Sequence, residues 1–124
     1  MKIRVLAAAL AACLTAAPLF AQAAFAHSYL RVANPAVGST VASSPPALEC
    51  SFTEPLEPHF SSLEIKDAAG KPASDGPMHL DPADARRMIL PLTKLAPGLY
   101  TVTWHATSVD THRTEGHFTF TVAP

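Results

Sequence analysis

The chain has 124 residues, of which 48% are hydrophobic and 15% charged, with 12 prolines, 5 glycines and a formal charge of −1. This length allows one domain. A domain of this size buries only ~60–70% of its unfolded-chain surface, which is enough for one core and disfavours a deep catalytic cavity between two domains.

The first predicted element is a secretory signal peptide over residues 1–26. It begins with the basic residues Lys2 and Arg4, continues with an apolar run over residues 5–20, and ends with small residues at 24 and 26. The pattern predicts export through a cleaved signal. No later segment approaches the ~20 consecutive apolar residues of a membrane-spanning helix, so we expect no stable membrane insertion.

Cleavage after Ala26 would leave a single domain, residues 27–124, with seven Lys and Arg against ten Asp and Glu. This acidic balance argues against a nucleic-acid partner. Two other processing routes stay open. One is cleavage after Ala23, and the other is lipidation of Cys13, because the residues before it resemble a bacterial lipobox.

Short strands are predicted along the rest of the chain. Proline and glycine recur at intervals too short for a long helix. Between them, every second residue is apolar in four segments, the period of a strand with one buried face: residues 48–52, 63–65, 100–104 and 118–122. The spacing predicts a small antiparallel sandwich or barrel with Tyr100 and Trp104 in its core. Residues 81–87 have room for at most one helical turn.

Cys50 is the single cysteine of the predicted domain, so the sequence supports neither a disulfide framework nor a thiolate metal site. It alternates with Leu48 and Phe52. We therefore expect a small apolar side chain buried in a strand.

His27 is the first unusual histidine, because cleavage after Ala26 would make it the N-terminal residue. Its α-amine and its imidazole Nδ1 could then close a six-membered ring on one metal ion, and the amine has a reference pKa of ~7.7–8.0. An internal histidine cannot do this. If cleavage falls elsewhere, His27 is a solvated side chain.

Asp110 and His112 form the second unusual feature. Two residues apart in an extended chain, their side chains point the same way and can share one ion. Together with an N-terminal chelate they would make an N,N,N,O set, which suits tetragonal Cu(II), with zinc as the rival ion. The alternative interpretation is a turn in which Asp110 caps the backbone and His112 is exposed.

Other histidine, methionine and arginine side chains are weaker candidates. We expect solvent exposure for three histidines and an arginine pair: His59, His105, His117, Arg86 and Arg87. Met78, His79 and Met88 form a thin candidate for a soft-metal site, and packing or loop exposure is the favoured interpretation.

Several segments together resemble the CopC family of periplasmic copper-binding proteins, also called the copper resistance or YobA-like family. The matching pieces run along nearly the whole predicted domain: His27, the turn at 34–39, the Phe-Thr-Glu-Pro-Leu segment at 52–56, the Leu-Ala-Pro-Gly-Leu-Tyr-Thr-Val-Thr-Trp segment at 95–104, and the Ser-Val-Asp-Thr-His segment at 108–112 leading into residues 116–122.

The resemblance implies an all-β fold, a small Greek-key β-sandwich or barrel of immunoglobulin-like or cupredoxin-like shape, with one Cu(II) ion at one end. His27 would supply amine and imidazole, His112 the second imidazole and Asp110 an oxygen, with the Glu54 carboxylate a weaker candidate nearby. Residues 73–87 lack the methionine-rich loop of family members that bind Cu(I), which points to the Cu(II)-only type.

The expected function is non-enzymatic: a monomeric periplasmic Cu(II)-binding protein for copper transport, buffering, homeostasis or resistance. The resemblance suggests a CopD-like inner-membrane copper transporter as partner. Two alternatives stay open. One is a copper-dependent oxidative enzyme with an N-terminal histidine chelate, although no aromatic stacking platform is evident. The other is a metal-free β-sandwich interaction module, which copper would not stabilise.

Overall fold

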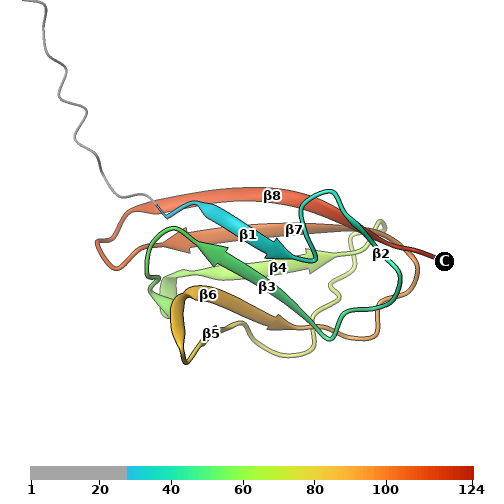
Figure 1. The fold of residues 1–124 in the computed structure, drawn as a ribbon, viewed down its shortest axis with the longest axis horizontal. Coiled ribbons are helices and arrows are strands. Elements are labelled where there is room, and N and C mark those ends of the chain that lie inside the picture. The colour runs from blue at the N-terminus through green and yellow to red at the C-terminus, as the bar shows by residue number, and fades with distance from the viewer. Residues whose placement is uncertain (1–27) are drawn as a thin grey trace, which may run out of the picture.

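The computed structural model describes residues 28–124 (Figure 1). The predicted signal peptide, Cys13 and His27 lie outside the described residues. Within the described range the chain forms eight strands and one short 3-10 helix: β1 (Leu30–Asn34), β2 (Thr40–Val41), β3 (Ala47–Phe52), η1 (Pro58–Phe60), β4 (Ser62–Lys66), β5 (His79–Asp81), β6 (Asp84–Pro91), β7 (Gly98–Thr107) and β8 (Arg113–Val122). No helix in this range is long and apolar enough to cross a membrane.

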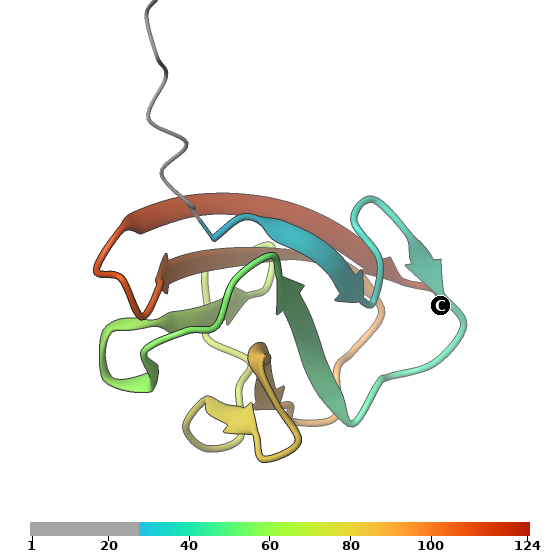
Figure 2. The ribbon, with the colours of Figure 1, turned by 60° about the vertical axis from the view of Figure 1, so that its left-hand side comes forward.

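Two four-stranded sheets form the two layers of a sandwich. One has the strand order β1-β3-β6-β5 and the other β2-β8-β7-β4. Figure 2 shows β3 and the β5–β6 hairpin on one side of the molecule and β7 with β8 on the other. The predicted all-β sandwich is confirmed. Pairing is antiparallel throughout except between β2 and β8, which run parallel.

The core lies between the sheets and consists of the inward-facing residues of the predicted strands. In β3 the alternation is strict, with Leu48, Cys50 and Phe52 buried and their neighbours half-buried. Trp104 of β7 packs its ring edge-on against Phe52, with the ring centroids 5.2 Å apart. The expected burial of Tyr100, Trp104 and Cys50 is confirmed.

Gly116 of β8 lies directly opposite Trp104 in the register of the second sheet. A Cβ atom added at Gly116 would stand 2.6 Å from Cζ2 of the indole. No real Cβ contact is that short, so the absence of a side chain at position 116 is what lets the indole lie across β8.

Residues 81–87 hold no helical turn, the most that the sequence allowed there, because the chain turns between β5 and β6 and then continues as β6. Oδ1 of Asp81 accepts the backbone N–H of Ala83 at 2.9 Å and closes the turn. Alternation in the sequence did not reveal β6, because the outward-facing Ile89 is apolar like its inward-facing neighbours. Next to the buried Met88 and Leu90 it makes a continuous apolar run without period-2 alternation.

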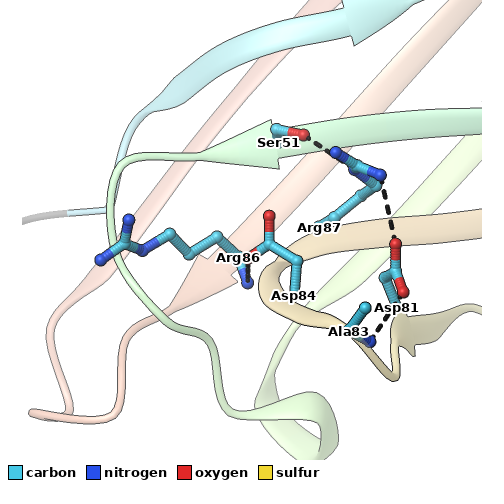
Figure 3. A network of polar contacts seen from close by, with 6 residues as sticks. All are labelled: Ser51, Asp81, Ala83, Asp84, Arg86 and Arg87. Carbon is cyan, nitrogen blue, oxygen red and sulfur yellow. Dashed lines mark hydrogen bonds and ion pairs between the residues drawn. The ribbon is translucent and has the colours of Figure 1, made fainter.

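Arg87 also departs from expectation, since it is not a freely solvated side chain. Its guanidinium donates to Oδ2 of Asp81 at 3.2 Å and to Oγ of Ser51 at 3.3 Å, which ties β3 to β5 and β6 (Figure 3). Arg86 is exposed, as predicted, and its side chain points away from this network.

Candidate metal centre

The connection between β7 and β8, residues 108–112, lies at one end of the sandwich together with the start of β1 and the β3–β4 connection (Figure 1). Backbone hydrogen bonds hold these segments to one another. Val109 N–H donates to Pro55 C=O at 3.1 Å, and Glu57 N–H donates to Thr107 C=O at 2.8 Å. The β7–β8 loop is therefore fixed against a neighbouring segment of the fold.

The loop is a compact turn rather than extended chain. Thr111 N–H donates to Ser108 C=O at 2.8 Å, and Ser108 N–H donates to His112 C=O at 2.9 Å. Thr111 has a φ of 74°, an uncommon conformation for a β-branched residue. The expectation of an extended segment is thus wrong here: the backbone forms a turn, as the alternative interpretation expected, but His112 is half-buried rather than exposed.

The turn nevertheless brings Asp110 and His112 together. Oδ1 of Asp110 lies 3.2 Å from Nδ1 of His112, and the side chains are 46% and 33% exposed. Two donors about 2.0–2.2 Å from one ion and about 90–100° apart are roughly 3 Å from each other, so the pair fits neighbouring ligands. The same distance also lets the carboxylate accept the Nδ1 proton and orient the ring, as carboxylates do beside metal-bound histidines.

Asp110 is held in its ionised form. The hydroxyl of Ser108, a residue only 1% exposed, donates to Oδ1 of Asp110. This hydrogen bond is the main reason that the pKa of the Asp110 carboxyl lies below its usual value, and the side chain and backbone of His112 add to the effect. The carboxylate therefore carries its charge at neutral pH and can serve as an anionic metal ligand.

Ser28, the first described residue, is tied to the same end of the fold and has no exposed surface. Its hydroxyl donates to Glu54 C=O at 3.2 Å, and its carbonyl accepts a hydrogen bond from the hydroxyl of Thr114. Tyr29 and Thr53 extend the attachment, with Thr53 N–H donating to Tyr29 C=O at 2.9 Å. No sequence pattern signals the Ser28–Thr114 contact, because the two residues lie 86 positions apart.

Other candidate ligands are not brought to this pair. Among residues 28–124, no group of three or more His, Cys, Asp or Glu side chains is placed to hold a metal ion. Glu54 is half-buried. Its backbone carbonyl, and not its carboxylate, accepts the hydrogen bond from the Ser28 hydroxyl. The structure thus joins Asp110 to His112 without adding the Glu54 carboxylate.

The remaining histidines and methionines follow their simpler interpretations. Exposure is confirmed for His59, His105 and His117. Met88 has no exposed surface whereas His79 is exposed, so packing explains this methionine better than a soft-metal site. Two aromatic side chains outside the predicted strands, Tyr29 and Phe60, are 56% and 64% exposed.

A β-sandwich with a preformed carboxylate–imidazole pair at one end is typical of a metal-binding domain. Comparison with known proteins identifies the family of this domain. The chain belongs to the CopC family, because the CopC domain model matches residues 30–123.

Individual relatives agree with this assignment. The chain is 37% identical over 99 residues to Protein YobA of Escherichia coli strain K12, covering 79% of this chain and 80% of YobA. It is 34% identical over 115 residues to Copper resistance protein C of Xanthomonas campestris pv. juglandis, covering 88% and 90%. The crystal structure of CopC from Methylosinus trichosporium OB3b superposes with a TM-score of 0.73 at 35% identity, covering 79% and 95%.

Proposed function

We propose that the exported chain binds one copper ion as Cu(II) at the end of the sandwich that holds Asp110 and His112. The protein is a copper-binding member of a copper resistance family and not an enzyme. The observation that carries the site is the 3.2 Å contact between Asp110 and His112 on a loop fixed by backbone hydrogen bonds. An imidazole and a carboxylate fit the borderline character of Cu(II).

His27 supplies the remaining donors in this proposal, through its α-amine and imidazole. Two observations support it. The described residues offer only the Asp110–His112 pair at this loop, with no third His, Cys, Asp or Glu grouped with them. In addition, Ser28 is the next residue along the chain, and its carbonyl accepts a hydrogen bond from Thr114. Thr114 lies two positions after His112. The chelate requires a free amine, and therefore cleavage between Ala26 and His27.

The biological role follows from this chemistry. Ligands held on a rigid β scaffold keep the ion in a defined coordination, which suits a periplasmic carrier or buffer in copper resistance. A CopD-like inner-membrane transporter is the proposed recipient, and the protein acts as a monomer. Signal cleavage and export are part of the same proposal, because the N-terminal donors exist only in the processed chain.

The test is a Cu(II) EPR spectrum of the exported, naturally processed protein beside a version with one extra alanine before His27. We expect a nitrogen-rich tetragonal signal that weakens and changes with the added residue. Identical weak spectra from the two proteins would reject the N-terminal chelate. A melting temperature that copper does not raise would instead favour the metal-free interaction module.

A competition titration with single variants tests the other two ligands. His112→Ala and Asp110→Ala should each lower copper affinity. His117→Ala is the matched control, because His117 is an exposed histidine on the same strand pair but away from the loop. Unchanged affinity in His112→Ala would show that the assignment of this ligand is wrong.

A further inference from the structure

We propose that Thr114 is a positioning residue for the copper site. Its hydroxyl holds Ser28, the residue to which the N-terminal donors of His27 are attached. The inference rests on the proposed function, because it concerns how the N-terminal chelate reaches the Asp110–His112 pair. Thr114 is not proposed as a ligand. Its part is to hold the carbonyl of Ser28, the first described residue, against β8.

The contact between Thr114 and Ser28 is built into a buried corner of the fold. Ser28 has no exposed surface, and two of its polar groups are engaged: the carbonyl accepts from Thr114 and the hydroxyl donates to the Glu54 carbonyl at 3.2 Å. A buried carbonyl that loses its donor carries an uncompensated desolvation cost, so the Thr114 hydroxyl is needed to keep Ser28 in this place.

Thr114 is itself rigidly placed. It is the second residue of β8 and pairs with Ala106 of β7, which is 1% exposed. The pairing of β8 with β7 therefore fixes the position of the Thr114 hydroxyl. His112, the last residue of the turn, precedes Thr114 by two residues in the sequence.

Chain geometry links this contact to metal binding. One residue spans at most ~3.3–3.6 Å, so the amine of residue 27 starts within about one residue's length of Ser28. With Ser28 fixed beside Thr114, the point at which the N-terminal donors are attached to the fold is set before any metal arrives. Without the Thr114 bond, the metal itself would have to order the terminal residues, and its affinity would fall.

The experiment compares three variants of the naturally processed protein with the wild type. Thr114→Val removes the hydroxyl and keeps a β-branched side chain, whereas Thr114→Ser keeps the hydroxyl. Thr119→Val is the matched control, a half-buried threonine further along β8. Each protein is measured by Cu(II) competition titration, by Cu(II) EPR and by thermal unfolding without metal, with binding measured at a temperature at which all variants are folded.

We expect Thr114→Val to bind Cu(II) about 10-fold more weakly, the lower end of what loss of an outer hydrogen bond costs a metal site. Its EPR spectrum should shift toward that of the extra-alanine protein. Thr114→Ser and Thr119→Val should keep the wild-type affinity and spectrum. Wild-type behaviour of Thr114→Val would overturn the inference, and so would failure of Thr114→Ser to restore binding, because the effect would then come from packing.

The outcomes also separate this inference from the proposed function. If the wild-type spectrum is indifferent to the extra alanine, the N-terminal chelate is wrong and the positioning role falls with it. If the wild-type protein has the chelate and Thr114→Val binds equally well, only the positioning role is rejected.

Discussion

Oδ1 of Asp110 lies 3.2 Å from Nδ1 of His112, across a turn whose residue Thr111 has a φ of 74°. Most residues in this backbone region are glycine, asparagine or aspartate, and a β-branched residue there costs free energy. The turn is retained because hydrogen bonds from Thr111 and Ser108 hold it on both sides. The carboxylate and the imidazole are therefore already arranged in the metal-free protein, which is the preorganisation that the proposed copper site requires.

Ser108→Ala should weaken copper binding about 10-fold to 100-fold, the range for loss of a group that supports a metal ligand. The buried Ser108 hydroxyl donates to the Asp110 carboxylate and lies 3.3 Å from the His112 carbonyl. Its loss frees the carboxylate to rotate and raises the pKa of Asp110 toward its ordinary value. Competition titration and an NMR titration of the Asp110 carboxyl measure the two effects, and Ser62→Ala serves as a surface control. An unchanged affinity would show that the hydroxyl does not support the site.

The metal-free protein should lose stability in acid partly through Asp110. Because the pKa of this carboxyl is lower in the folded state than its ordinary value of 3.8, its contribution to stability is present above that value and disappears as pH falls through the folded-state pKa. The difference in free energy of unfolding between wild type and Asp110→Asn should be constant near neutrality and shrink below pH 3.8. Urea unfolding across this range measures it, and a difference that grows in acid would contradict the sign.

Gly116→Ala should destabilise the fold by about 1–3 kcal/mol, the usual cost of overpacking. The added methyl group would meet the Trp104 ring at 2.6 Å, and the indole is held in turn by Phe52. Trp104 is the only tryptophan of the chain, so its fluorescence should report the displacement directly. The exposed neighbour variant His117→Ala should stay within about 0.5 kcal/mol of wild type. Equal stability of both variants in urea would show that the indole adapts freely.

Cys50 should resist thiol reagents in the folded protein. Burial raises the pKa of its thiol to about 12, so almost no thiolate exists at pH 8, and the side chain has no exposed surface. Labelling with a thiol-reactive dye at pH 8 should be negligible in buffer and complete in denaturant. Labelling in buffer at the rate of an unfolded peptide would show that the core around Cys50, between the two sheets, opens readily.

The sequence predicted those parts of the fold that local periodicity encodes. In β3, β7 and β8, alternation between apolar and polar residues identified both the strand and its buried face, including Cys50, Tyr100 and Trp104. In β6 it failed, because the outward-facing Ile89 is apolar as well as the inward-facing Met88. Period-2 reasoning requires one polar face, and a strand with two apolar faces does not provide it.

For the candidate metal centre, the sequence by itself determined which residues have suitable chemistry. The ligand types of Asp110 and His112, their spacing, and the resemblance of their segment to the CopC family are all properties of the linear chain. The tertiary structure decided how the two side chains meet, through a turn at Thr111 rather than an extended segment. It also placed Ser28 beside Thr114 across 86 residues. Local patterns cannot encode such contacts, because they depend on which strands the sandwich brings side by side.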